Sequence, residues 1–260
     1  MRKKSLQLYA SQHGFSELLE DLLSHGCDVN SSDCASNIGS DSTGPIPKAS
    51  LLSWASVNNH IGAVRVLLAH KANIHSTSEK GYTALTCAAR YRRLDIVRVL
   101  LDAGAEVNVL TSAGKSPYES AMSEGLHLTR EQIDDKLVKD EARWDIEARL
   151  AIAEMLLEEG SSIFDQSGRP VIEAALKYDM QDIVQFHLRK GLLGRDGIYK
   201  IGEKLEARTL LERAVEKNAY SVAQFLLSEG CDPFQGDEDG NNALTYANID
   251  RLVKVLYSTS

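Results

Sequence analysis

The sequence predicts an all-α solenoid in which short helical hairpins stack on one another. Related segments recur along the chain, and Thr83 lies 33 residues after Ser50 and 33 before Ser116. A period in this range is typical of repeat architectures, in which each repeat buries its apolar side only against its neighbours. Within a repeat, apolar residues recur at helical spacing and a glycine often follows the second apolar run, as Gly104 does.

Each repeat begins with a residue suited to the start of a helix. Serine, threonine and asparagine cap a helix by accepting a hydrogen bond from a backbone N–H, and proline is tolerated in the first turn. A small residue follows five positions later in every repeat, which indicates that helices approach closely there. The repeats start near Ser5, Ser50, Thr83, Ser116, Pro170, Thr209 and Asn242.

The turn between the two helices of a repeat has its own signature. It falls on Gly, Asn or Asp in five of six repeats, and these residue types accept left-handed backbone angles. Arg92 is the exception.

The segment from Gly81 to Asn108 resembles the ankyrin repeat, which reads roughly G-x-T-P-L-H-x-A-A-x-x-G-H-x-x-I-V-x-L-L-L-x-x-G-A-D-V-N. The resemblance covers nearly the whole chain apart from three insertions. It implies one ankyrin-repeat domain over residues 1–260, with short β-hairpin finger loops, a concave binding face and a shortened last repeat. No repeat keeps T-P-L-H intact, and the histidine position is held by Leu8, Ser53, Thr86, Glu119, Glu173, Glu212 and Thr245.

Three insertions interrupt the period, near residues 31–49, 126–149 and 192–208. The first is rich in Ser, Gly, Asp and Pro and is interpreted as a surface loop, with a partner-contacting finger as the alternative. The second predicts an extra or extended helix near 129–149. Its charges, including a helical pair between Asp145 and Arg149, are interpreted as a solvated face rather than a docking helix. The third is a basic loop, either solvated or in contact with an anion.

Composition excludes several classes of protein. The 260 residues carry a net charge of −8, which disfavours a nucleic-acid footprint. No stretch approaches 18 apolar residues, so no membrane span is expected. No signal peptide is apparent, and an intracellular location, cytoplasmic or nuclear, is predicted. The four cysteines are scattered and are interpreted as reduced structural thiols.

The sequence contains no recognisable catalytic apparatus. There is no P-loop, GxSxG, HExxH or dinucleotide fingerprint, and the seven histidines form no ligand-spaced cluster. We therefore predict a non-enzymatic, monomeric protein with no catalytic residue, cofactor or metal.

The resemblance implies that a partner protein or peptide binds to the finger loops and the concave row of first helices. Aromatic and arginine side chains are enriched at binding hot spots. The alternative for some candidates, above all Trp54, is packing between repeats. The predicted function is an interaction scaffold or adaptor. A small-molecule-binding protein or unconventional enzyme, with its site in the groove walled by the insertions, is the alternative. The candidate binding residues are Tyr9, Trp54, Tyr82, Arg90, Tyr91, Lys115, Tyr178 and Arg213.

Overall fold

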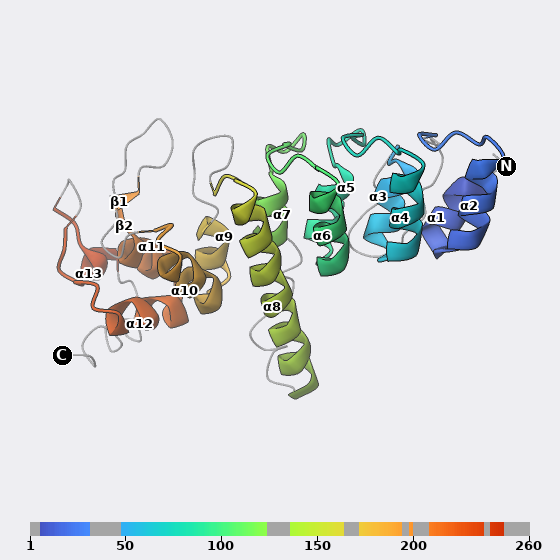
Figure 1. Ribbon diagram of the computed structural model, residues 1–260. Coiled ribbons are helices and arrows are strands. Elements are labelled where there is room, and N and C mark those ends of the chain that lie inside the picture. Colours follow the sequence, from blue (N-terminus) through green and yellow to red (C-terminus); the bar gives the residue numbers. More distant parts are fainter. Residues whose placement is uncertain are drawn as a thin grey trace. The chain divides into compact units, whose positions relative to one another are not determined.

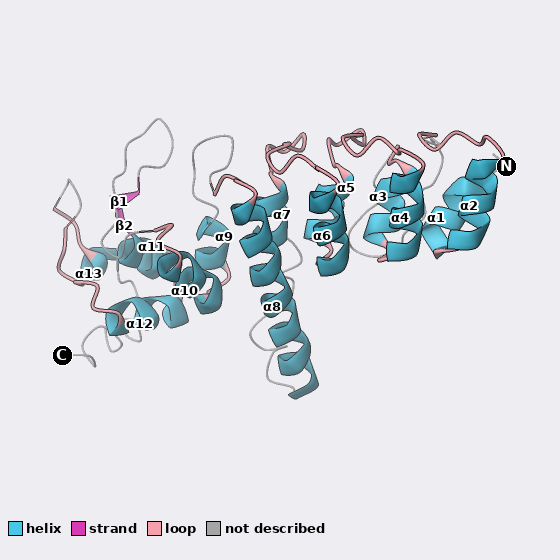
Figure 2. Ribbon diagram, in the orientation of Figure 1, coloured by secondary structure: helices cyan, strands magenta, loops and turns pink. Residues whose placement is uncertain are grey.

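Within the described part of the chain, the regular secondary structure is almost entirely helical (Figure 1, Figure 2). The computed structural model falls into two bodies, Met1–Ser162 and Ile163–Ser260. Each body is described by itself, and the prediction of a single repeat domain over residues 1–260 stays a prediction. The structure describes residues 6–31, 48–123, 136–163, 172–193, 198–199, 208–236 and 240–246.

The N-terminal body contains four helical hairpins in succession. The first helices of these hairpins contact one another in the order α1, α3, α5, α7, and we call them the first-helix row. The second helices contact one another in the order α2, α4, α6, α8. The hairpins are α1 (Leu6–His13) with α2 (Ser16–Ser24), α3 (Leu51–Val57) with α4 (Ile61–Ala69), α5 (Ala84–Arg90) with α6 (Leu94–Asp102), and α7 (Pro117–Ser123) with α8 (Lys136–Glu158).

The core of this body lies between its two rows of helices. The small residue that recurs five positions after each repeat start has no exposed surface in any of the four hairpins, so it belongs to the core. The second helices contribute branched apolar side chains to the same core. The fully buried positions include Ala10, Ala55, Ala88 and Ala121 from the first helices and Leu19, Val64, Val97 and Ala153 from the second.

The predicted helix caps are confirmed where the structure describes them. The Ser50 hydroxyl accepts a hydrogen bond from the Ser53 N–H at 3.1 Å, and the Thr83 hydroxyl accepts one from Thr86 at 3.1 Å. These bonds satisfy N–H groups that have no partner within the helix. Ser53 and Thr86 stand at the family's histidine position. The residue at that position therefore donates its backbone N–H to the capping hydroxyl.

Helix α8 shows what the second insertion does. At 23 residues it is far longer than its neighbours, and Figure 1 shows it extending past α6. An extended helix near 129–149 was expected; residues 124–135 lie outside the described part of the chain. The expectation that Arg149 belongs to a solvated face is wrong, because its side chain is fully buried. Arg149 Nη1 donates a hydrogen bond to the Ala121 carbonyl on α7 at 2.6 Å.

Finger loops join consecutive hairpins. Thr111 N–H donates to the Lys115 carbonyl at 2.9 Å and closes one loop, and Ser78 and Tyr82 form the equivalent bond at 3.0 Å in the preceding loop. A further bond from Ser112 N–H to the Lys80 carbonyl at 2.9 Å ties the two loops together. The fingers are thus stacked hairpin turns, and their described residues form no strand.

The C-terminal body repeats the hairpin pattern. Helix α10 contacts α9 and α12, while α11 contacts α12 and α13. The strands β1 and β2 pair antiparallel, with Ile198 opposite Thr209 and Tyr199 opposite Arg208, so a segment within the third insertion pairs with the end of that insertion. The elements are α9 (Ile172–Lys177), α10 (Gln181–Arg189), β1 (Ile198–Tyr199), β2 (Arg208–Thr209), α11 (Leu210–Glu216), α12 (Tyr220–Ser228) and α13 (Ala243–Tyr246).

The turn residue Asp179 joins two repeats of this body. Its carboxylate accepts hydrogen bonds from the backbone N–H groups of Ser221 and Val222 at 3.1 and 3.0 Å. A carboxylate at the first turn of α12 also suits the positive end of the helix dipole.

Within the described residues, no helix is both long enough and apolar enough to cross a membrane.

A buried histidine makes the stability of the C-terminal body depend on pH. His187 on α10 is 1% exposed, and its Nδ1 lies 2.7 Å from the Ile183 carbonyl. Burial lowers the pKa of His187 below 6.5, and the Ile183 carbonyl opposes this shift in part. On acidification the unfolded chain therefore takes up the proton first. The stabilisation is complete above pH 6.5 and is lost as the pH falls below it.

We expect His187→Gln to reduce this pH dependence. Urea unfolding of the wild type and the variant would be compared at about pH 7.5 and about pH 5. The wild type should lose more stability between the two conditions than the variant does. Substituting the exposed His25 by glutamine is the matched control and should leave the wild-type difference intact. Equal losses in the wild type and His187→Gln would contradict the assignment.

Candidate functional site

Three of the predicted binding residues come together at α5, and we call Tyr82, Arg90 and Tyr91 the Arg90 cluster. Arg90 Nη1 donates a hydrogen bond to the Tyr82 hydroxyl at 2.6 Å. The guanidinium carbon lies 5.4 Å from the centre of the Tyr82 ring and 5.8 Å from that of Tyr91. All three side chains are partly exposed. An arginine within about 6 Å of aromatic rings is attracted by their quadrupoles, so the cluster is held in place before any partner arrives.

The shortness of α5 explains how these residues meet. Tyr82 precedes the capping Thr83, and Arg90 ends the seven-residue helix. All six helical residues from Ala84 to Ala89 are buried, so the exposed surface here comes from the two ends of the helix. The Arg90 side chain therefore spans α5 from its last residue to the tyrosine before its first.

Cys87 lies on the same helix and is fully buried. Burial raises the pKa of the Cys87 thiol to about 12, although the positive charge of Arg90 acts in the opposite direction. The thiol is therefore protonated at neutral pH and is unsuited to act as a nucleophile.

Two further arginines follow the cluster. Arg92 Nη1 donates to the Arg90 carbonyl at 3.3 Å, and Arg93 Nε donates to the Val57 carbonyl on α3 at 3.0 Å. Burial foremost, and then the charge of Arg92, lowers the pKa of Arg93. Arg90, Arg92 and Arg93 thus carry three positive charges at and after the C-terminal end of α5.

Arg93 also illustrates a contact that recurs between repeats. His60 stands at the same repeat position, and its Nε2 lies 2.9 Å from the Gln12 carbonyl at the end of α1. Each of these side chains contacts the end of the first helix in the preceding repeat.

Trp54 and Arg213 are largely buried rather than displayed. Trp54 on α3 is 8% exposed, which favours the alternative that it packs between repeats. Arg213 on α11 is also 8% exposed and forms an ion pair with Glu173 on α9. Arg213 therefore contributes to the packing of the C-terminal body.

The remaining candidates lie in different places. Tyr9 on α1 is 43% exposed, and its ring centre lies 4.4 Å from that of His13 and 5.9 Å from that of Phe15. Lys115 ends a finger loop, where its N–H donates to the Thr111 hydroxyl at 3.1 Å. Tyr178 follows α9 and is 46% exposed, with the Lys177 ammonium 5.2 Å from its ring centre.

Sequence reasoning missed several exposed apolar side chains. Leu6 is 53% exposed, although Leu51 at the same repeat position is 1% exposed. Leu51 lies on α3, which contacts α1, α4 and α5, whereas the contacts of α1 are with α2 and α3. The repeat pattern marks both leucines as core and gives no signal of the difference. Phe15 and Phe234 are exposed as well.

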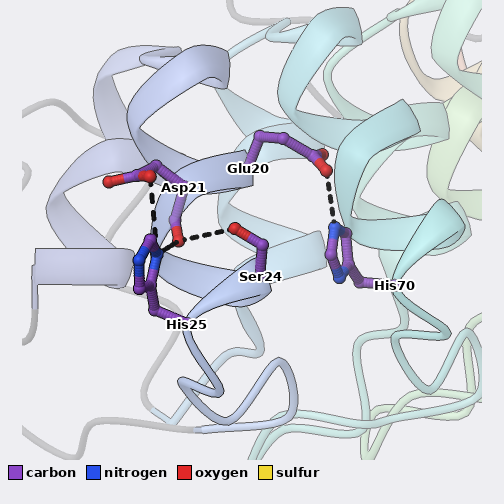
Figure 3. Close-up of polar contacts among 5 residues, drawn as sticks. All are labelled: Glu20, Asp21, Ser24, His25 and His70. Carbon is purple, nitrogen blue, oxygen red and sulfur yellow. Dashed lines mark hydrogen bonds and ion pairs between the residues drawn. The ribbon is translucent and has the colours of Figure 1, made fainter.

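Five polar residues of α2 and of the ends of α2 and α4 form local contacts (Figure 3). The Ser24 hydroxyl donates to the Asp21 backbone carbonyl at 2.9 Å rather than to His25. His25 is highly exposed, and its Nδ1 contacts the same carbonyl at 2.7 Å. His70 Nε2 lies 3.0 Å from Glu20 Oε1 and joins α4 to α2. No three His, Cys, Asp or Glu residues of the described chain are grouped so as to hold a metal ion.

Comparison with known proteins agrees with this architecture. A family model for ankyrin repeats, in three copies, matches residues 6–111. The crystal structure of the human ASB11 ankyrin repeat domain superimposes with a TM-score of 0.66 at 21% identity, covering 99% of this chain and 98% of that one. Residues 6–111 thus match the ankyrin repeat family, and the whole chain has the fold of an ankyrin repeat domain. Its ankyrin repeats are diverged, since none retains the T-P-L-H motif.

Two curated proteins are similar to this chain over most of its length. The Caenorhabditis elegans ankyrin repeat and KH domain-containing protein mask-1 is 26% identical over 246 residues, which is 90% of this chain and 9% of that protein. The human mitochondrial disaggregase is 27% identical over 208 residues, which is 80% of this chain and 26% of that protein. The chain thus spans only a minor part of either relative.

Proposed function

We propose that this chain is a protein-interaction scaffold or adaptor that binds a partner through its finger loops and the ends of its first helices. Ankyrin repeat domains generally bind other proteins, and the ankyrin fold places these segments side by side along the stack. The Arg90 cluster is the observation that carries the proposal. It combines two tyrosines and an arginine, the side chains enriched at interaction hot spots, in an arrangement already ordered by their mutual contacts.

The test is affinity capture with a matched pair of variants. The tagged chain would be used to capture partners from a native extract, and the bound proteins would be identified by mass spectrometry. We expect Arg90→Ala combined with Tyr91→Ala to lose a specific partner. The control is Arg98→Ala on α6, which removes an equally charged but exposed side chain from the opposite row of helices. If the double variant retains its fold and captures the same proteins, the proposal is wrong.

The alternative of an enzyme or small-molecule site has less support. The buried Cys87 is protonated, and the described residues offer no metal-holding group. A monomeric state, an intracellular location and the lack of nucleic-acid binding stay predictions. Light scattering of the purified chain would test the first of these.

A further inference from the structure

We infer that the Arg90 cluster binds an acidic peptide segment of the partner, with a carboxylate on the Arg90 guanidinium and a neighbouring apolar side chain against the tyrosine rings. This inference rests on the proposed function and specifies the chemistry of the partner. The observation that supports this inference is the presence of positive charge and aromatic surface together at α5.

The segment that carries the cluster is basic, although Asp95 follows it directly. Residues 80–94 contain four Lys or Arg residues and no Asp or Glu, within a chain whose net charge is −8. The preceding carboxylate, Glu79, forms an ion pair with Lys48. A positive patch of this kind attracts a negatively charged partner and favours the orientation that places its carboxylates there.

The geometry of Arg90 suits a carboxylate. A guanidinium presents five N–H donors in a planar fork that matches the two oxygens of a carboxylate. Its bond to the Tyr82 hydroxyl and its position over two rings limit the rotamers that it can adopt. Binding therefore costs less side-chain entropy than it would for a mobile arginine.

The overall charge favours a peptide over a nucleic acid. A polyanion longer than the patch would also meet the remainder of an acidic chain, which repels it. A short acidic segment engages the patch alone. The Tyr82 and Tyr91 rings add apolar surface to the patch. An apolar side chain next to a Glu or Asp of a peptide can pack against these rings, whereas a phosphate backbone cannot.

A second cation–tyrosine pair occupies the same repeat positions in the C-terminal body. Lys177 and Tyr178 correspond to Arg90 and Tyr91, and the Lys177 ammonium lies 5.2 Å from the tyrosine ring centre. Tyr178 is 46% exposed. The same contact between a cationic side chain and a tyrosine ring therefore occurs at the end of a first helix in a repeat other than that of α5. It is a second place at which an acidic residue of the partner would bind.

The experiment begins with a library of short random peptides selected on the whole chain. We expect the recovered peptides to be enriched in Glu or Asp next to an apolar residue. Selection on Arg90→Gln should lose this enrichment, and selection on Arg98→Gln should retain it. The absence of acidic enrichment on the wild type would overturn the inference. Tight binding of single-stranded DNA at the same patch, competing with the peptides, would also overturn it.

A double-mutant cycle then tests the contact itself. The best peptide and its Glu→Gln version would be titrated against wild type and Arg90→Gln by fluorescence anisotropy. We expect each single change to weaken binding about tenfold, equivalent to about 1.4 kcal/mol, and the second change to add little. Fully additive losses would mean that Arg90 does not contact the carboxylate. Because Arg90→Gln could disturb α5, Tyr82→Phe provides a second test, and we expect it to weaken binding less than Arg90→Gln does. Tyr82→Phe removes only the hydroxyl that positions Arg90.

The two proposals fail in different ways. If Arg90→Ala with Tyr91→Ala abolishes capture of a native partner but the selected peptides show no acidic preference, the interaction function stands and the acidic-segment inference falls. If the double variant captures every partner normally, both fall.

Discussion

Replacing Arg149 by alanine is expected to lower the free energy of unfolding by about 3 kcal/mol, because it removes a large buried side chain and a hydrogen bond together. Arg149 is the largest fully buried side chain among the described residues, and its Nη1 donates to the Ala121 carbonyl at 2.6 Å. The alanine variant would leave a cavity between α7 and α8 and a buried carbonyl without this donor. Urea unfolding followed by circular dichroism measures the loss.

The variant Arg149→Met distinguishes the effect of lost side-chain volume on stability from the effect of the lost guanidinium group. Methionine fills much of the same space without a charge, and exchanging buried ionic groups for apolar ones of similar size is often neutral. We therefore expect Arg149→Met to cost about 1 kcal/mol, the hydrogen-bond share alone. The exposed Arg98→Ala is the surface control and should change stability by less than about 0.5 kcal/mol. Equal losses for the alanine and methionine variants would show that packing at this site matters little.

Gly81→Ala is expected to lower the free energy of unfolding by about 3 kcal/mol, through backbone strain and a steric clash. Gly81 has φ 74°, a left-handed angle that disfavours any side chain. A Cβ there would lie 3.0 Å from both the Ser112 nitrogen and the Thr111 Cα, which belong to the next finger loop. Backbone atoms cannot move aside as a flexible side chain can. Thermal or urea unfolding would measure the effect.

Gly104→Ala is the matched control for Gly81. Its φ is 82°, but a Cβ at Gly104 would meet no atom within 4 Å. Gly104→Ala should therefore lower the free energy of unfolding only by the cost of the left-handed backbone angle, about 1 kcal/mol. The difference between the two variants measures how tightly the finger loops stack. If both variants lose the same stability, the close approach of the loops is not what requires glycine at position 81.

Much of the fold could be predicted because its determinants act within one repeat. Ser50 and Thr83 cap their helices through residues three positions away, and the recurring small residues Ala55 and Ala88 are fully buried. Arg92 shows the limit of such local rules. It adopts φ 57° at the turn although arginine has no preference for it, because the packing of the hairpin imposes that conformation.

The candidate site was harder to predict, because exposure depends on what lies beside a residue. Trp54 and Tyr9 hold the same repeat position, yet the first is 8% exposed and the second 43%. Arg213 was expected on a binding surface and instead pairs with Glu173 one repeat earlier. Nothing within a single repeat distinguishes these cases.

The chain's own pattern was sufficient for the repeat period, the caps and the helical hairpins, since these depend on short-range hydrogen bonds and on apolar spacing along one helix. It was not sufficient for the burial of Arg149 or for the ion pair of Arg213 with Glu173. Those outcomes depend on which side chains neighbouring elements bring together. A long side chain such as arginine can reach either solvent or a buried carbonyl, and only the packed stack determines which is closer.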